Sequence, residues 1–240
     1  MSGVRLSATQ ARLRVAMPIQ RGTPVEHSHG SYLTPRSGSR VRRLSRRDLP
    51  TDTVELARYL IGKILVHDSA QGRTSGRIVE TEAYVPGDAA GHAYIGETSR
   101  NRSLFLKRGH AYVYFIYGCW FAVNVSAETA GVGAGVLLRA LVPIDGVDLM
   151  RRRRHAESLT DLARGPGRLA SAMAITRALD GVDLTRPSPL WLGDDLHAAP
   201  HIGVTTRIGL SKEAHRPLRF YSRSLQHLRF ISGPRRALTG

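Results

Sequence analysis

Cysteine, acidic residues and long apolar runs are all scarce in this sequence. The single cysteine, Cys119, cannot form an intramolecular disulfide and excludes a cluster ligated by several cysteines, which fits a reducing compartment. No stretch holds the ~18 uninterrupted apolar residues of a membrane-spanning helix, and no apolar core of a signal peptide opens the chain. These absences predict a cytoplasmic protein without a membrane partner.

The shortage of acidic residues leaves the chain strongly basic, with 35 Lys and Arg against 19 Asp and Glu and a net charge of +16. Residues 1–47 hold ten arginines and one acid, so they carry +9 and the remaining chain carries +7. A basic body favours a polyanionic partner such as nucleic acid. Arginine outnumbers lysine 32 to 3, as in proteins of GC-rich bacterial genomes, so charge alone leaves both explanations open.

The first 47 residues lack hydrophobic periodicity and are rich in Ser, Gly, Arg and Pro, which predicts a disordered basic tail. Residues 48–240 have the 2.0- and 3.6-residue patterns of a folded domain. Its first helix is expected over 52–61, with Asp52 as N-cap and Gly62 as the stop. Two more helices are expected over 146–159 and 165–179.

Strand-like segments separated by Gly, Asn and Ser make up the rest of this domain. They are 63–68, 76–85, 111–118, 120–127, 135–143, 190–195, 201–210 and 217–224. Strands that follow one another without intervening long helices favour antiparallel pairing over repeated βαβ units. The sequence therefore predicts an α+β fold, with a curved, mainly antiparallel sheet and packed helices.

Glu80 and Glu82 are the first candidates for chemistry, because they lie two residues apart in "GRIVETEAY" and so share one face of a strand. A carboxylate in a partly dry pocket can act as a general base or a metal ligand. The structural alternatives are a solvated strand face or a Glu paired with an arginine such as Arg77. Asp88 and His92 follow after a turn, but no H-x-x-x-H or paired-Cys pattern supports a metal site.

Basic residues precede a concentration of aromatic residues in "RNRSLFLKRGHAYVYFIYGCWF". The basic residues are Arg100, Arg102, Lys107 and Arg108, and the aromatic ones are Tyr112, Tyr114, Phe115, Tyr117, Trp120 and Phe121. Such a combination suits phosphate neutralisation and base stacking. An aromatic core strand is the alternative, although alternation places Tyr112 and Tyr114 on one face and tyrosine is costly to bury completely.

The order of motifs resembles the alkyladenine (3-methyladenine) DNA glycosylase family. The resemblance covers about Leu49 to Phe220 and rests on "GRIVETEAY", "RNRSLFLKRGHAYVYFIYG", "NVS", "VLLRALVP", "GPGRLASAMAI" and "PLRFY". It implies a monofunctional base-excision repair enzyme that flips alkylated or deaminated purines out of duplex DNA and hydrolyses the N-glycosidic bond. It further implies no cofactor, no metal and damaged double-stranded DNA as partner, with a monomeric, nucleoid-associated bacterial protein as the expected form.

The same resemblance implies roles for individual residues. Glu82 would activate the attacking water. Tyr84 and His92 would line the base pocket with Tyr114 opposite, and Asn124 would crowd the 2-amino group of normal guanine. Tyr117 would be the wedge inserted into the duplex, Arg139 would hold the phosphate of the flipped nucleotide, and Arg100 and Arg102 would bind further phosphates. Glu97 departs from the basic loop expected between His92 and Arg100.

Two other functions remain compatible with parts of the sequence. A non-catalytic nucleic-acid-binding module would keep the basic and aromatic surface but would not need Glu82. A glycoside hydrolase with a carboxylate pair would use both glutamates but would not need the arginines. Release of a free purine base from duplex DNA distinguishes the glycosylase from both.

Overall fold

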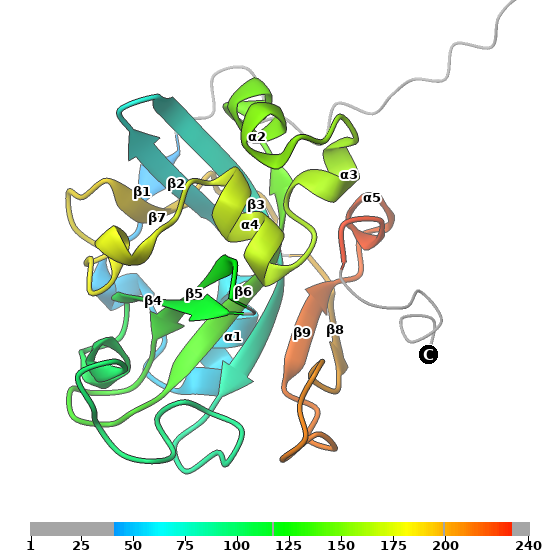
Figure 1. The fold of residues 1–240 in the computed structure, drawn as a ribbon. Helices are drawn as coiled ribbons and strands as arrows, with labels where there is room; N and C mark the ends of the chain where they lie inside the picture. Colours follow the sequence, from blue (N-terminus) through cyan, green and yellow to red (C-terminus); the bar gives the residue numbers. More distant parts are fainter. Residues whose placement is uncertain (1–40, 117, 199, 232–240) are drawn as a thin grey trace, which may run out of the picture. The chain divides into compact units, whose positions relative to one another are not determined.

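The computed structural model describes residues 41–116, 118–198 and 200–231, all of which belong to the unit formed by residues 31–240. Figure 1 shows this unit as a curled sheet with short helices. Its strands are β1 (Arg42–Arg43), β2 (Ile64–Ser69), β3 (Gly72–Tyr84), β4 (Ala111–Ile116), β5 (Trp120–Ser126), β6 (Gly135–Pro143), β7 (Leu190–Asp194), β8 (Ile202–Thr205) and β9 (Arg219–Ser222). Its α-helices are α1 (Thr53–Leu60), α2 (Val147–Arg154), α3 (Leu159–Leu162), α4 (Pro166–Ala172) and α5 (Leu225–Leu228), and its 3-10 helices are η1 (Arg46–Asp48), η2 (Arg102–Phe105) and η3 (Arg177–Leu179).

The described strands pair antiparallel in the order β1-β7-β2-β3-β6-β5-β4, and β9 joins β3 to β8. Strand β3 is the central element. Strand β6 pairs along residues 76–84 of β3, whereas β2 pairs with residues 72–77 and β9 with residues 80–82. Because a strand has two edges, β2 and β9 share the edge that β6 leaves. The predicted α+β fold with a curved antiparallel sheet is confirmed.

Helix α1 has the ends that the sequence predicts. The Asp52 side chain accepts hydrogen bonds from the backbone N–H groups of Val54 and Glu55, both at 2.9 Å, which satisfies two of the free donors of the first turn. Gly62 follows the helix with a φ of +92°, a left-handed conformation that glycine adopts without a side-chain clash. Leu56 and Leu60 are fully buried, and α1 packs on β3 and β6.

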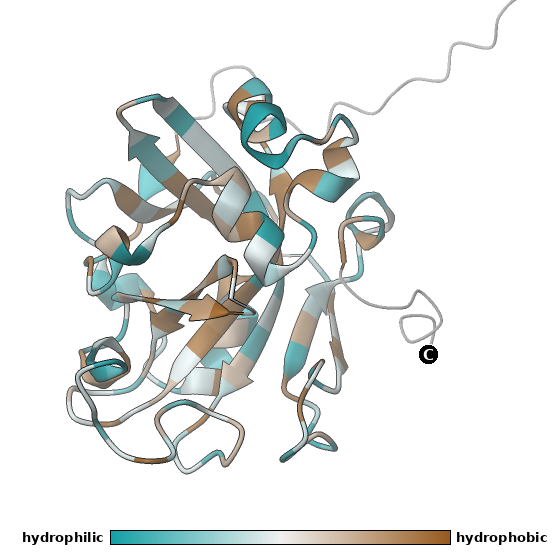
Figure 2. Ribbon diagram, in the orientation of Figure 1, coloured by the Kyte–Doolittle hydropathy of each residue, from teal (hydrophilic) through white to brown (hydrophobic). Residues whose placement is uncertain are grey.

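The later helices are shorter than the sequence predicts. The segment expected as one helix over 165–179 consists of α4 and η3, separated by residues that include Ala174 at a φ of +52°. The segment expected over 146–159 forms α2 only to Arg154, where His155 adopts a φ of +47°. Helix α4 packs on β5 and β6 with α2 beside it. Figure 2 shows the apolar character of β5 and β6 and the hydrophilic surface of α2.

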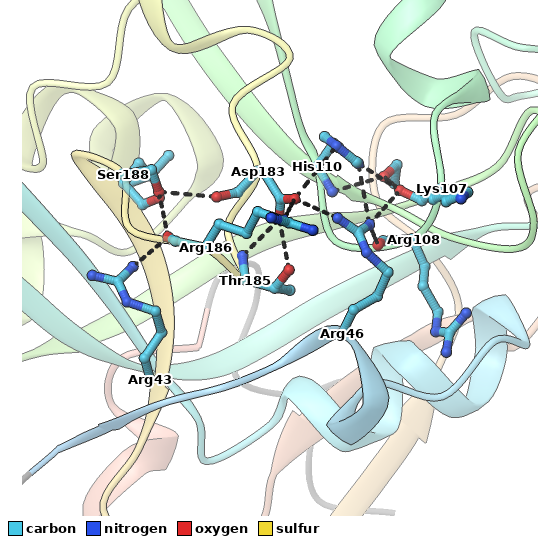
Figure 3. A network of polar contacts seen from close by, with 11 residues as sticks. Arg43, Arg46, Lys107, Arg108, His110, Asp183, Thr185, Arg186 and Ser188 are labelled. Atoms are coloured by element: carbon cyan, nitrogen blue, oxygen red, sulfur yellow. Dashed lines mark hydrogen bonds and ion pairs between the residues drawn. The ribbon is translucent and has the colours of Figure 1, made fainter.

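Described structure begins within the range predicted as a tail. Residues 1–40 lie outside the described residues, but residues 41–47 include β1 and the start of η1, and Leu44 is fully buried. Arg46 fastens this segment, because its guanidinium donates to the carbonyls of Lys107 and Arg108 and pairs with Asp183 (Figure 3). A two-residue strand and a single arginine anchor have no periodic pattern, so sequence reasoning missed them.

None of the helices in the described part of the chain has the length and apolar character that a membrane crossing requires. The longest α-helices, α1 and α2, have eight residues each. The main cluster of buried apolar residues joins the sheet to these short helices. Leu169 and Met173 from the α4 region, for example, belong to the same buried cluster as Leu56 and Leu138.

His227 in α5 generates a prediction about the pH dependence of stability. It is 5% exposed and its Nδ1 lies 2.8 Å from Ser222 Oγ. Burial, with a smaller contribution from the charge of Arg77, lowers the pKa of His227 to about 4. The unfolded chain binds this proton near the ordinary pKa of about 6.5, so acidification from about 6.5 to about 4 favours unfolding.

We expect the free energy of unfolding to fall across this window by at most about 1 kcal/mol per pH unit from His227, allowing for partial solvent screening. Replacing His227→Gln should flatten the pH dependence of the melting temperature over that window. Parallel curves for the two proteins would contradict the assignment of this proton to His227.

Candidate active site

The two glutamates singled out by their spacing lie in the middle of the central strand. Glu80 and Glu82 of β3 are both fully buried. Burying two like charges so close together is unfavourable unless opposite charges accompany them. The neighbouring strands supply those charges, since β6 contributes Arg139 and β9 contributes Arg219. The four side chains form a buried cluster with no net formal charge.

Arg139 connects the two carboxylates. Its Nε lies 3.1 Å from Glu80 Oε1 and its Nη1 lies 3.1 Å from Glu82 Oε2, while Arg219 Nη1 lies 2.9 Å from Glu80 Oε1. The pairing of β3 with β6 shifts register on both sides of Glu80. Such irregularities re-aim side chains, and here Arg139 falls between the paired residues Leu138 and Ala140.

Glu80 pairs with arginine, as one of the alternatives predicted. The predicted partner, Arg77, is wrong, because Glu80 pairs with Arg139 and Arg219. Arg77 instead makes a bidentate ion pair with Asp195, with N–O distances of 2.6 and 3.0 Å, and donates to the Gly62 carbonyl at 2.8 Å. The charged partners of both residues lie more than 50 positions away along the chain. Sequence spacing within one strand could not identify them.

Glu82 accepts two further hydrogen bonds, one from its own strand and one from the loop after β8. Tyr84 Oη donates to Glu82 Oε2 at 3.0 Å, and the backbone N–H of Ile208 donates to Glu82 Oε1 at 2.9 Å. Burial and then the Glu82 charge raise the pKa of Tyr84 well above its usual range, so its hydroxyl stays protonated and remains a donor. With Arg139, three described groups therefore fix both oxygens of this carboxylate.

A cavity of about 280 Å³ lies directly above this cluster. Aromatic side chains form much of its wall, with Asn124 and Leu137 on the neighbouring strands and Ile208, Gly209 and Leu210 on a loop. Glu82 is not part of the wall, but Tyr84, Arg139 and Ile208, which all contact it, are. The carboxylate therefore lies beneath the floor of the cavity.

The structure places most predicted site residues together. Those that line the cavity are Tyr84, His92, Arg100, Tyr114, Asn124 and Arg139. Arg102 is exposed on η2 and does not line it. Tyr117, the predicted wedge, lies outside the described residues. Arg139, predicted to hold a phosphate, is 7% exposed and pairs with both glutamates as well as facing the cavity.

Three rings form one wall of the cavity. Tyr112 and Tyr114 stack with their centroids 5.1 Å apart, as expected for residues on one face of β4, and His92 meets Tyr114 edge-on at 4.5 Å. The Tyr112 hydroxyl lies 2.9 Å from His92 Nδ1. Sequence reasoning named Tyr112 among the aromatic residues but gave it no role in the site. Burial and the nearby charge of Arg100 lower the pKa of His92, which favours the neutral imidazole.

The loop that carries His92 is organised by Asn101. Its Nδ2 donates to the carbonyls of His92 and Gly96, at 2.8 and 2.9 Å, and its Oδ1 accepts from the Thr98 N–H at 2.7 Å. Asn101 is 3% exposed. Glu97, the departure from the expected basic loop, is exposed to solvent. The loop thus holds His92 in place through one buried amide.

Arg207 is the main site residue that sequence reasoning missed. It forms a fully buried bidentate ion pair with Asp88, donates to the Ala83 carbonyl at 3.1 Å and lies 4.7 Å from the centre of the Tyr84 ring. Its neighbour Ile208 contacts Glu82. The segment was predicted to be a strand over 201–210, but β8 ends at Thr205 and the following loop turns towards the cavity.

The ion pair also changes the interpretation of Asp88, which the sequence considered as a metal ligand. Both of its carboxylate oxygens bind Arg207, and Oδ1 also accepts from the Ala90 N–H at 3.0 Å. Within the described residues, no group of three or more His, Cys, Asp and Glu side chains is arranged to hold a metal ion. Asp88 therefore anchors the loop beside Glu82.

Comparison with known proteins gives the family. Residues 47–226 match the family model of methylpurine-DNA glycosylase. Among curated relatives, proteins named "Putative 3-methyladenine DNA glycosylase" occur in Mesorhizobium japonicum (60% identical, covering 80% of this chain and 91% of the relative), Paraburkholderia phytofirmans (53%, covering 81% and 90%) and Methanoculleus marisnigri (46%, covering 75% and 94%). The chain belongs to the methylpurine-DNA glycosylase family.

The Asp88–Arg207 pair predicts a large and local effect on stability. Asp88→Asn removes one charge of a fully buried pair and leaves the Arg207 charge uncompensated, which should cost about 3–5 kcal/mol of unfolding free energy. Asp161→Asn is the matched control, because Asp161 also accepts from two arginines but its side chain is 43% exposed, so its loss should cost about 1 kcal/mol or less. Chemical denaturation measures both. Equal losses would contradict the role of Asp88 as a buried anchor.

Proposed function

We propose that this member of the methylpurine-DNA glycosylase family hydrolyses the N-glycosidic bond of alkylated or deaminated purines in duplex DNA, with water as the nucleophile. The observation that carries the proposal is a buried carboxylate, Glu82, fixed directly beneath an aromatic cavity. A base inside a duplex cannot reach such a cavity, so the nucleotide has to be flipped out first.

Glu82 serves as the general base in this proposal. A carboxylate has about four acceptor sites, and Tyr84, Ile208 and Arg139 occupy three of them. The remaining lone pair accepts a proton from water that enters with the substrate. That water attacks the anomeric carbon of the sugar, the glycosidic bond breaks, and the base leaves with the bonding electrons.

The cavity wall provides selectivity for the damaged base. The faces of Tyr84, Tyr112 and Tyr114 are electron-rich, so they favour purines that alkylation has made electron-poor or cationic. A neutral His92 beside them avoids repulsion of a cationic base. Asn124, 5% exposed on β5, crowds the exocyclic 2-amino group of guanine and disfavours the normal base.

Two arginines have complementary tasks. Arg139 holds Glu82 in place and faces the cavity, where it meets the phosphate of the flipped nucleotide. Arg219 pairs with Glu80 at the same oxygen that Arg139 contacts, so two arginines together neutralise that carboxylate. Arg100, at the cavity, and Arg102, exposed on η2, supply further phosphate contacts.

The monofunctional character of the proposed reaction agrees with the positions of the lysines. A glycosylase with lyase activity needs an amine nucleophile beside the sugar. The chain has three lysines, and none of them is among the described residues that line the cavity. Lys63 pairs with Asp194 at 2.8 Å, and Lys212 lies 6.0 Å from the centre of the Tyr94 ring.

Glu82→Gln should abolish measurable base release while duplex binding persists, because the amide keeps the shape and loses the proton acceptor. General-base catalysis contributes about 10²–10⁴-fold. Single-turnover excision from a duplex with one hypoxanthine measures the loss. The control is Glu80→Gln on the same strand. This variant should be less stable than the wild-type protein, but its excision rate should fall far less than that of Glu82→Gln. Near-normal excision by Glu82→Gln would refute the assignment.

Excision should also survive an excess of EDTA, because the proposed chemistry uses a carboxylate and water without a metal ion. The same single-turnover assay, run with chelator and then with individual divalent cations added back, measures this. Activity that disappears with chelator and returns with one cation would favour a metal-dependent hydrolysis instead.

A further inference from the structure

Four consecutive arginines end α2, and the structure gives them different surroundings. Arg151 pairs with Asp148 at 3.0 Å on the same helix. Arg153 donates to the Ala172 carbonyl at 3.0 Å and to Gln71 Oε1 at 3.0 and 3.3 Å, so it connects α2 to the last residue of α4 and to the β2–β3 turn. Arg152 is exposed beside Leu149 on another face of the helix.

Arg154 differs from its neighbours because aromatic contact replaces polar contact. Its guanidinium carbon lies 5.1 Å from the centre of the Trp120 ring, and its Nε is buried without a hydrogen-bond partner in the described part of the chain. A buried donor without an acceptor is unfavourable. The enclosed Nε is out of reach of solvent, but the half-buried guanidinium has no hydrogen bond from its terminal Nη groups within the described residues, so these groups can still bind an anion from outside.

The charges around Arg154 are unbalanced. Asp161 is shared by Arg164 and Arg168, whose guanidinium nitrogens lie 3.1 and 3.2 Å from Oδ1. Burial and then the charge of Arg168 lower the pKa of Arg154, while Asp161 compensates only in part. Three arginines thus surround one carboxylate, which leaves a local excess of positive charge.

This excess of charge lies next to the opening of the cavity. Trp120 is the first residue of β5, immediately after the turn that joins β4 to β5. Gly167 at the start of α4 lies so close to the Trp120 ring that an added Cβ would be 3.1 Å from it. The preceding residue, Pro166, lines the cavity. Arg154, through Trp120, and Arg168, two residues after Pro166, therefore lie beside the α4 end of the cavity wall.

We propose that Arg154, with Arg168 beside it, binds a backbone phosphate of the DNA that flanks the flipped nucleotide. The guanidinium rests on Trp120 and presents its free donors to phosphate oxygens, a geometry that arginine supports better than lysine. The site lies outside the cavity and takes no part in the chemical step. This inference rests on the proposed function, because it assumes that DNA approaches the cavity opening.

The test measures binding of the full chain to an undamaged duplex over a series of salt concentrations. Arg154→Gln should lower the slope of log K against log salt by about 0.9, which corresponds to one phosphate contact and roughly 8-fold weaker binding at 0.1 M salt. Arg152→Gln is the matched control, with the same loss of charge on the same helix but a different face, and should leave the slope unchanged. Arg168→Gln should reduce the slope as Arg154→Gln does.

Arg154→Lys separates charge from packing. Because lysine retains the charge, this variant should keep most of the salt dependence of the wild-type protein, although its planar contact with Trp120 is weaker. Single-turnover excision at saturating enzyme should be unchanged in the Arg152→Gln control. An unchanged salt slope in Arg154→Gln would overturn the proposal, and so would an equal loss of slope in Arg152→Gln. It would also be overturned if Arg154→Lys bound DNA as weakly as Arg154→Gln and had a lowered melting temperature.

Failure of the proposed function would look different. A wild-type protein that releases no base, yet binds duplex DNA with a slope that depends on Arg154, would refute the glycosylase and leave the phosphate site standing. If the wild-type protein excises bases but the salt slope of its DNA binding does not depend on Arg154, the glycosylase stands and the phosphate site is refuted.

Discussion

The candidate site depends on the neutralisation of two buried glutamates by two buried arginines. Both carboxylates are 0% exposed, and burying a charged group without an opposite charge is unfavourable for carboxylate and arginine alike. The cluster draws on three strands, since Glu80 and Glu82 come from β3, Arg139 from β6 and Arg219 from β9. The charge balance therefore holds the centre of the sheet together and at the same time fixes the Glu82 carboxylate.

That dependence explains why the sheet is irregular at this point. A regular ladder would place Arg139 in register with one residue of β3, whereas the two register shifts around Glu80 allow it to reach both carboxylates. A second buried pair, Asp88 with Arg207, fixes the loop that brings the Ile208 N–H to Glu82. Geometry at one carboxylate is thus maintained by residues from four separate segments.

The parts of the structure that the sequence predicted are those governed by local periodicity. Alternation placed Glu80, Glu82 and the pair Tyr112 and Tyr114 correctly, and Asp52 capped α1 as expected. The parts that it missed depend on contacts between distant residues. Arg77 pairs with Asp195 rather than Glu80, and Arg207 lies in a loop that the alternation of "HIGVTTRIGL" made resemble a strand. Charge pairs over such distances leave no periodic signal in one sequence.

The structure shows which charges contribute to the net charge of +16 and which cancel one another. The cluster beneath the cavity contributes nothing to it, because two glutamates cancel two arginines. The excess positive charge of the described residues lies in part on solvent-exposed arginines such as Arg100, Arg102 and Arg168. Exposed charges are screened by salt, whereas a buried ion cluster is screened much less. The charge of the surface can therefore vary without disturbing the contacts of Glu82, except through Arg139, which pairs with Glu82 and also faces the cavity.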